Sequence, residues 1–189
     1  TPIRSDNTHL VWDGIPGTSR VLVSTYTKYA SSYQNCIGDT ISLTWGVTWV
    51  TVGNELKDKI ENSIVSENRL DLRIRQMLGL PPTNQSKYIV EMWVYPADLF
   101  RPAKDPEIDD TVCQLSFPAN VSQDYINWFN NNSASSYGEN GYPWTQLGYT
   151  YDWGNIVGKV GLSEYCIKQN ANVKIKSVAT VNDYFEPVR

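Results

Sequence analysis

One carboxylate, Glu164, stands where a glycine-rich loop over residues 154–161 meets a predicted strand. The strand pattern alternates, so Glu164 shares a face with Leu162 and Cys166. A carboxylate on an apolar face must be paired, protonated or open to a cleft. In a cleft it can stabilise a developing cation or accept a proton. The competing interpretation is a Glu at a strand edge, paired with a nearby Lys or Arg.

Aromatic side chains cluster just upstream of this carboxylate. Tyr149, Tyr151 and Trp153 alternate, so we expect them on one strand face, with Asp152 solvated on the other. Rings arranged in this way can stack on a flat, ring-bearing ligand. An aromatic ladder on a sheet face would produce the same pattern.

Composition limits the class of protein. The chain has 189 residues, of which 41% are hydrophobic and 19% charged, which indicates an ordinary folded protein. The net charge of −4 argues against nucleic acid as a partner, because phosphate binding needs a basic surface. The sequence contains no apolar run near the roughly 20 residues of a membrane-spanning helix.

The compartment is predicted from sequons and cysteines. Sequons for N-glycosylation begin at Asn84, Asn120 and Asn131, and together with the scarcity of charged residues they favour a secreted, extracellular protein. The three cysteines are too widely spaced for a local zinc motif. Either one pair forms a disulfide or all three are free thiols. The single histidine, His9, makes a Ser-His-Asp triad improbable.

The elements that must position these groups follow from periodicity. Alternation predicts strands over 9–12, 20–26, 41–52, 87–95, 162–168 and 173–181, the last two joined as a hairpin. Apolar residues at helical spacing predict helices over 54–64, 66–78 and 120–129, with a polar loop over 130–140. With no long linker, residues 1–189 are predicted as one α+β domain: a twisted, mainly antiparallel sheet with two or three packed helices. Residues 1–8 are predicted to be a flexible arm.

Two charged segments have simpler interpretations. The acidic loop 105–110 has the carboxylate density of a calcium loop, but Pro106 and a missing glycine break that spacing, so calcium is possible and a solvated loop is favoured. No other metal site is predicted. Arg69, Arg73 and Arg75 are predicted to form a solvated helix face.

The stretch 163–167, followed by 172–175, resembles the third motif of the ADP-ribosyltransferase superfamily, in which a loop delivers a Glu or Gln at the start of a strand. A related branch comprises secreted NAD glycohydrolases. The resemblance implies NAD as the substrate, no required cofactor, and Glu164 as the catalytic carboxylate that stabilises the oxocarbenium ion formed as nicotinamide leaves. A protein target would be the acceptor in a toxin or effector of this kind.

The other two motifs of that superfamily have weaker counterparts. Arg101 is preferred for the first motif and would hold a phosphate or ribose. The segment 147–151 stands in for the second motif. The resemblance therefore gives a catalytic pair, Glu164 and Arg101, and the substrate-binding residues Tyr149, Thr150, Tyr151, Trp153 and Ser163. A clean copy of the first motif on an early strand is missing.

Two alternatives from other classes stay open. Seven tryptophans and an acidic balance also suit a carbohydrate-binding module. A glycosidase would need a second acid, for which Glu91 is the candidate. A non-catalytic secreted interaction protein is the other alternative. Such a protein would tolerate Glu164→Gln, whereas an NAD-consuming enzyme should not.

Overall fold

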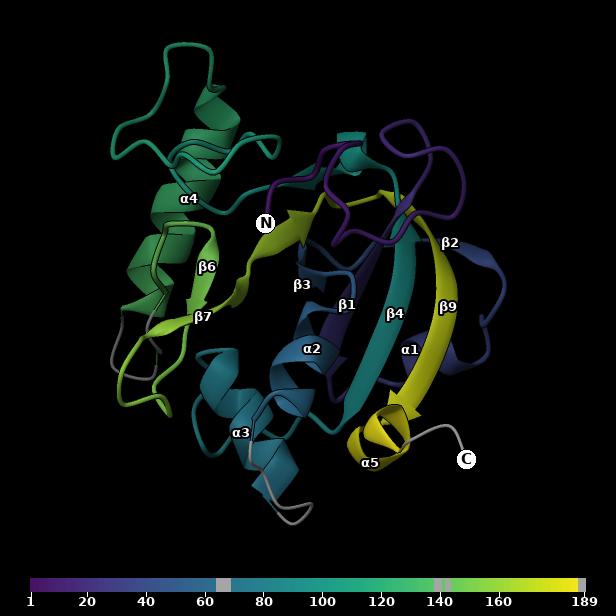
Figure 1. Ribbon diagram of the computed structural model, residues 1–189. Coiled ribbons are helices and arrows are strands. Elements are labelled where there is room, and N and C mark those ends of the chain that lie inside the picture. The colour runs from purple at the N-terminus through teal and green to yellow at the C-terminus, as the bar shows by residue number, and fades with distance from the viewer. Residues whose placement is uncertain (64–68, 138–140, 142–143, 187–189) are drawn as a thin grey trace.

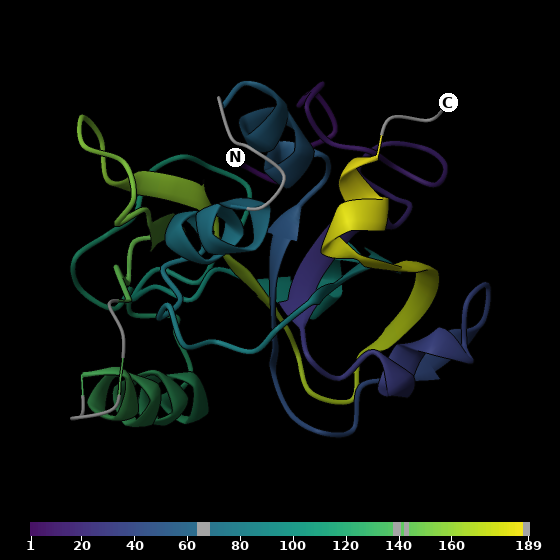
Figure 2. The ribbon, with the colours of Figure 1, turned by 90° about the horizontal axis from the view of Figure 1, so that it is seen from below.

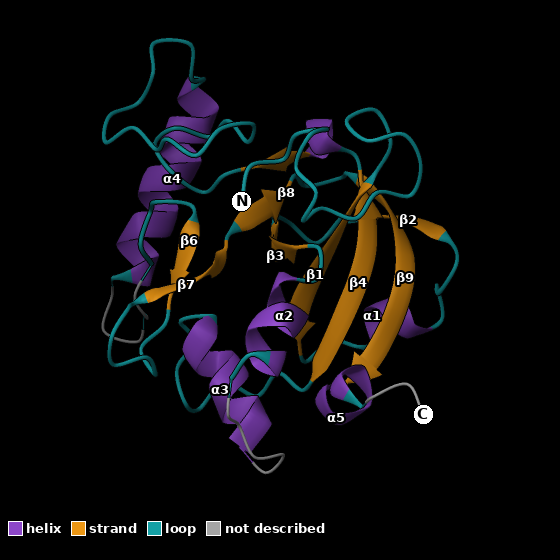
Figure 3. Cartoon of the chain, viewed as in Figure 1, coloured by secondary structure: helices purple, strands orange, loops and turns teal. Residues whose placement is uncertain are grey.

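The computed structural model describes residues 1–63, 69–137, 141 and 144–186 (Figure 1). It confirms the predicted α+β class, because a seven-stranded antiparallel sheet lies beside a two-stranded sheet and several helices (Figure 3). The large sheet has the order β2-β9-β4-β1-β3-β8-β5. Its strands are β1 (Val21–Thr27), β2 (Thr40–Ser42), β3 (Thr48–Val52), β4 (Tyr88–Val94), β5 (Leu99–Phe100), β8 (Tyr165–Ile167) and β9 (Asn172–Thr180).

The alternating apolar pattern of β4 explains why the sheet has a core on each face. Val90, Met92 and Val94 point into one buried cluster, which also takes side chains from β1, β3, β8 and β9. Ile89 points to the opposite face and joins the second cluster. Both faces of this central strand are therefore covered.

Three helices cover the second face: α2 (Glu55–Glu61), α3 (Leu70–Met77) and α5 (Val181–Phe185). Their apolar residues share one cluster, and Figure 2 shows the helices gathered together against the sheet. The predicted helix over 54–64 is thus α2, with residue 64 outside the described residues. The predicted start of the next helix at 66 also lies outside them, and α3 begins at Leu70. The short α1 (Ser31–Gln34) adds Tyr33 to the first cluster, and the 3-10 turn η2 (Pro96–Asp98) stands between β4 and β5.

The longest helix, α4 (Gln123–Ser136), lies beside the small sheet of β6 (Tyr149–Tyr151) and β7 (Val160–Ser163), away from the other helices (Figure 1). Its N-cap is Ser122, whose side chain accepts a hydrogen bond from the backbone N–H of Tyr125 at 3.2 Å. The predicted helix over 120–129 therefore exists but continues into the stretch predicted as a loop. Phe129 is buried, as its helical spacing predicted.

The predicted hairpin of the last two strands is wrong. β8 pairs with β3 and β5, whereas β9 pairs with β2 and β4, so the two strands occupy different places in the sheet. The connection between β8 and β9 lacks the glycine of a tight hairpin turn. It forms backbone hydrogen bonds with Leu43, which follows β2. The backbone N–H of Asn170 donates to Leu43 O at 2.9 Å, and Leu43 N–H donates to Ala171 O at 3.0 Å.

Two other predicted strands are shorter than expected. The run over 41–52 divides into β2 and β3, with Gly46 at a φ of 121° between them. Alternation along one continuous strand would put Trp45 on the same face as the buried Leu43, but the break between the strands leaves Trp45 51% exposed. The strand predicted over 9–12 reduces to one bridge, between Trp12 and Val21.

The N-terminal residues differ from the predicted flexible arm. Ile3 is 5% exposed and belongs to the main core cluster. Its backbone N–H donates to Ile108 O at 2.7 Å, and Tyr165 Oη donates to Thr1 O. An apolar side chain within a polar segment is enough to anchor it to the sheet.

Candidate functional site

A pocket with a volume of about 250 Å³ opens where the small sheet meets the first turn of α2 and the loop that follows β5. The N-terminal segment and Tyr165, the first residue of β8, complete its wall. The charged, hydroxyl and aromatic groups that line it belong to Thr1, Glu55, Lys59, Arg101, Asp110, Thr111, Tyr149, Ser163 and Tyr165, and the Thr1 ammonium donates to Ser163 Oγ at 3.0 Å. Carboxylate, cationic, hydroxyl and aromatic groups therefore meet in one place.

Glu55 is held by hydrogen bonds to both of its carboxylate oxygens. Its carboxylate accepts hydrogen bonds from the backbone N–H of Ser163, at 3.0 and 3.1 Å to the two oxygens. Ser163 Oγ lies 3.3 Å from Oε1, and Thr51 Oγ1 lies 3.3 Å from Oε2. These contacts join α2 to β7 across the pocket. They fix the carboxylate in one orientation.

Lys59 lies one turn along α2 from Glu55, a spacing that places both side chains on one helix face. Its Nζ donates to the backbone carbonyl of Gly161 on β7. This second contact between α2 and β7 brings a positive charge to the pocket wall.

Arg101 is buried and lines the pocket, but the loop that follows it occupies most of its donors. Nη1 and Nη2 each donate at 2.6 Å, to the carbonyls of Val112 and Asp110 respectively. Nη2 also lies 3.4 Å from a carboxylate oxygen of Glu107. The side chain packs against Gly148, where an added Cβ would lie 2.6 Å from Arg101 Cδ. Arg101 therefore shapes the pocket and gives it positive charge.

Two predicted substrate-binding residues, Tyr149 and Ser163, line the same pocket as Arg101. They face each other across the small sheet, where β6 pairs with β7. Tyr165, which sequence reasoning did not select, adds a hydroxyl. Burial, opposed by the charge of Arg101, raises the pKa of Tyr165 to about 12, so the hydroxyl stays protonated.

Glu164 lies between two pocket residues, Ser163 and Tyr165, but does not line the pocket itself. Alternation along an extended chain turns its side chain to the other side. There its Oε2 accepts a hydrogen bond from Trp144 Nε1 at 3.1 Å. Burial of the carboxyl group raises its pKa to about 8, with the Trp144 hydrogen bond acting in the opposite direction.

An aromatic cluster surrounds the partner of Glu164. Trp144 lies edge-on to Trp49 at 5.6 Å between ring centroids and contacts Phe129 at 5.0 Å. Trp128 lies against Trp49 at 6.3 Å. These rings pack on one another between α4 and the sheet, which is how aromatic side chains contribute to a core.

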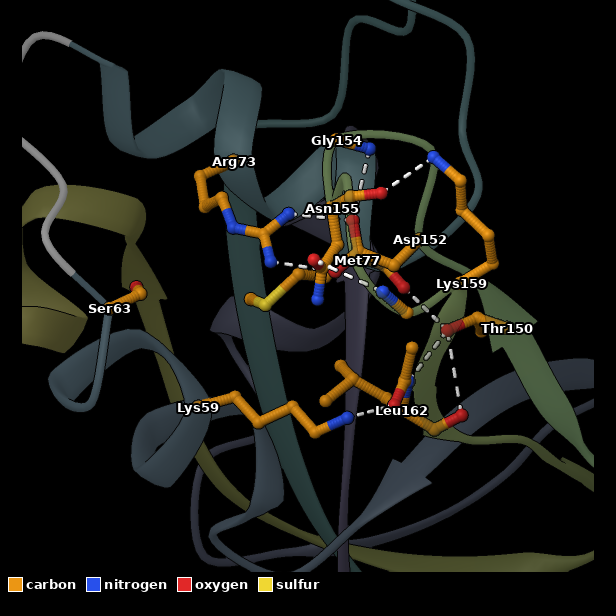
Figure 4. Close-up of polar contacts among 12 residues, drawn as sticks. Lys59, Ser63, Arg73, Met77, Thr150, Asp152, Gly154, Asn155, Lys159 and Leu162 are labelled. Carbon is orange, nitrogen blue, oxygen red and sulfur yellow. Dashed lines mark hydrogen bonds and ion pairs between the residues drawn. The ribbon is translucent and has the colours of Figure 1, made fainter.

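The remaining predicted substrate-binding residues have structural contacts outside the pocket lining. Thr150 Oγ1 donates to Met77 O and accepts from the backbone N–H of Leu162 at 2.8 Å (Figure 4). Trp153 Nε1 donates to Leu80 O at 3.0 Å. Tyr151 is half-buried on β6 and is also outside the lining. Thr150 and Trp153 therefore hold the small sheet against α3 and the segment that follows it.

Asp152 and Arg73 correct two predictions, because neither is a solvated surface group. Arg73 donates from both terminal nitrogens to the two carboxylate oxygens of Asp152, at 2.7 and 2.6 Å (Figure 4). The Asp152 side chain is 3% exposed and that of Arg73 19%. A buried carboxylate needs such a partner, and the sequence pattern gave no indication of it.

The second acid needed by a two-carboxylate glycosidase is not near Glu164. Glu91 lies on β4, which β1 and β3 separate from β8 in the sheet. Its oxygens accept from Tyr184 Oη at 2.9 Å and Ser177 Oγ at 3.0 Å, and pair with Lys176. Burial works to raise the pKa of Glu91, but these partners outweigh burial and hold it below 4.5.

The described residues contain no group of three or more His, Cys, Asp or Glu side chains placed to hold a metal ion. In the acidic loop predicted as a possible calcium site, the Arg101 guanidinium pairs with Glu107 and Asp110. The three cysteines are free thiols, and burial raises the pKa of Cys166 well above its usual value. Within the described part of the chain, each helix is too short or too polar to cross a membrane.

Comparisons of the chain with protein-family models, curated proteins and solved structures found no match.

Sequence reasoning missed Glu55, Lys59 and Tyr165. The predicted helix over 54–64 puts Glu55 in its first turn, where the helix dipole favours an acidic side chain and no other explanation is needed. Its contact with Ser163 spans 108 residues of sequence, and neither local pattern signals it. The spacing of Glu55 and Lys59 on one helix face was the available clue.

Proposed function

We propose that this protein is a secreted enzyme that cleaves the bond between nicotinamide and ribose in NAD, as a glycohydrolase or a mono-ADP-ribosyltransferase. One observation carries the proposal. The resemblance selects Arg101, which follows β5, and Tyr149 and Ser163, which lie on the paired strands β6 and β7, and all three residues line one pocket. The other residues that the resemblance selects, Glu164 among them, lie outside the lining, so the support comes from these three residues alone.

The chemistry of the pocket suits a nucleotide. Lys59 supplies positive charge for an anionic pyrophosphate, and hydroxyls on Ser163 and Tyr165 suit a ribose. Tyr149 supplies a ring for a base or nicotinamide. The volume of about 250 Å³ is below the roughly 300–1,000 Å³ usual for ligand pockets, so the pocket can take only part of NAD, such as one nucleoside half.

Secretion is part of the proposal. Two of the three sequons place their acceptor asparagines, Asn120 and Asn131, at exposed positions that a glycan can reach. The third, Asn84, uses its side-chain oxygen to accept from Ser86 N–H at 2.9 Å. Expression in a glycosylating host should therefore modify Asn120 and Asn131 more readily than Asn84, which mass spectrometry of the glycopeptides would measure.

The proposal is tested by incubating the purified protein with NAD and following nicotinamide by chromatography. We expect nicotinamide release, with free ADP-ribose for a glycohydrolase or protein-bound ADP-ribose for a transferase. Tyr149→Ala should weaken release, because the pocket loses its ring. Tyr151→Ala is the matched control, since Tyr151 lies on the same strand outside the pocket lining.

An absence of both NAD binding and nicotinamide release by the unmodified protein would contradict the proposal. A carbohydrate-binding module or a non-catalytic interaction protein would then be the class to test. For the first, a glycan-binding screen is the direct measurement.

A further inference from the structure

We infer that Glu55, rather than Glu164, is the carboxylate that acts on the reacting ribose. The inference rests on the proposed function and extends it. Glu55 lines the pocket together with Tyr149 and Ser163, whereas the Glu164 side chain lies outside the lining against Trp144. A carboxylate must reach the reacting atoms in order to stabilise charge on them.

The surroundings of Glu55 suit that role. The Ser163 N–H and the hydroxyls of Thr51 and Ser163 hold its two oxygens in a fixed orientation before any ligand arrives. A fixed carboxylate needs little reorganisation as positive charge develops, and this is the largest single contribution in many active sites. Lys59 lies one helical turn away and brings positive charge to the same pocket.

The surroundings of Glu164 do not suit a carboxylate that stabilises positive charge on the ribose. Its carboxyl group is enclosed beside an aromatic cluster, and burial raises its pKa to about 8. Near neutral pH most molecules therefore carry a neutral carboxylic acid at this position. A neutral acid cannot stabilise an oxocarbenium ion by charge. Its backbone N–H donates to Gly148 O at 2.9 Å, so the residue holds the small sheet next to the pocket.

The proposed reaction is the hydrolysis of NAD. The bond between nicotinamide nitrogen and ribose C1′ breaks, and its electron pair stays with nitrogen, so the pyridinium becomes neutral nicotinamide. The ribose becomes an oxocarbenium ion, whose positive charge the Glu55 carboxylate stabilises. Water then adds through its oxygen to C1′, and Glu55 takes the released proton and passes it to solvent. The products are nicotinamide, ADP-ribose and one proton.

The test compares Glu55→Gln with two matched variants in the full chain. Glutamine keeps an oxygen that can accept from Ser163 N–H, so the fold should survive, and a thermal melt checks this. Glu61→Gln is the control on the same helix, because Glu61 is exposed outside the pocket lining. Glu164→Gln tests the position that the family resemblance selects. Nicotinamide release gives the turnover, and ligand-observed NMR with NAD gives binding.

We expect Glu55→Gln to lower turnover by about 100-fold or more while NAD binding changes little, as loss of one transition-state contact does. Glu61→Gln and Glu164→Gln should stay within about threefold of the unmodified protein. Glu55→Asp, which keeps the charge, should retain more activity than Glu55→Gln. That comparison separates charge from a purely structural role, even if both variants lose stability.

Other outcomes overturn specific parts of the account. Full turnover by Glu55→Gln, or selective loss in Glu164→Gln, would overturn the assignment and leave the proposed function standing. Loss of NAD binding together with turnover in Glu55→Gln would make Glu55 a binding residue and overturn its role on the ribose. Neither binding nor turnover by the unmodified protein would overturn the proposed function, and the assignment with it.

Discussion

Arg73 and Asp152 form a bidentate, buried ion pair that fastens the segment following β6 to helix α3 (Figure 4). Asp152 directly follows β6, and Tyr149 of that strand lines the pocket with its partner Ser163 on β7. Asp152 also accepts from the backbone N–H of Gly154 at 3.1 Å, so the pair fixes the start of the glycine-rich loop. The position of the pocket wall therefore depends on a contact outside the pocket.

The first prediction concerns this ion pair. Arg73→Ala should destabilise the protein by about 3–5 kcal/mol, because it leaves a buried carboxylate without its partner. Urea unfolding followed by tryptophan fluorescence would measure the change. Arg69→Ala is the control, since Arg69 is exposed just before the same helix, and should change stability by less than about 0.5 kcal/mol. Equal changes in the free energy of unfolding for the two variants would show that the ion pair does not stabilise the protein.

The second prediction compares two glycines of the segment 154–161, Gly158 in the loop and Gly161 on β7. A Cβ at Gly161 would lie 2.2 Å from Thr150 Oγ1 and 2.3 Å from the Met77 carbonyl, whereas a Cβ at Gly158 meets nothing within 4 Å. Gly161→Ala should therefore cost about 3 kcal/mol or more, since backbone must move. Gly158→Ala should be nearly neutral. Paired thermal melts would check this, and a stable Gly161→Ala protein would mean that the small sheet packs less closely on α3.

The third prediction concerns the stability of the fold as pH changes. The pKa of Glu164 is raised to about 8 from an ordinary value of 4.5, so the folded state binds its proton more tightly than the unfolded state does. The favourable contribution of this proton is complete below pH 4.5 and is lost as pH rises through about 8. Glu164→Gln, which resembles the neutral acid, should match the unmodified protein at pH 4.5. At pH 9 it should be more stable by a few kcal/mol, on the order expected for such a shift.

The measurement for this prediction is the difference in melting temperature between the two proteins from pH 4.5 to pH 9. A difference that grows with pH supports the account. A constant difference would mean that the Glu164 carboxyl group is solvated and ionises normally.

The fourth prediction concerns the pH dependence of NAD cleavage. If Glu164 were the group that acts as an anion, turnover would rise as pH passes through about 8, where its carboxyl group ionises. With Glu55 in that role, turnover should show no rise centred near pH 8 in a profile of kcat from pH 6.5 to 9. The Glu164→Gln variant should give the same profile as the unmodified protein, and a rise that disappears in that variant would contradict the role of Glu55.

Local patterns predicted much of the fold because alternation in a strand and spacing in a helix show which side chains face the core. The alternation in β4 and the apolar stripe of α3 both predict buried side chains that the structure confirms, such as Met92 and Ile74. Pairing between distant strands is set by tertiary packing, which local alternation does not encode. For that reason the sequence placed β8 and β9 in one hairpin.

The candidate site could be predicted only in part, for the same reason. Arg101, Tyr149 and Ser163 were selected through a family resemblance, and they converge in the pocket. Glu55 depends on a contact between the start of a helix and a strand 108 residues later, which leaves no periodic trace. The buried pair of Arg73 and Asp152 likewise looks in sequence like two ordinary surface charges.

The most direct test of the central claim is a structure of the protein bound to an NAD analogue whose ribose ring oxygen is replaced by methylene. Such an analogue cannot form the oxocarbenium ion, so it should remain intact in the site. The account predicts its nicotinamide ribose in the pocket between Tyr149 and Ser163, within hydrogen-bond reach of Glu55. An analogue bound against Glu164 and Trp144, or at another surface, would contradict the claim, as would the absence of binding.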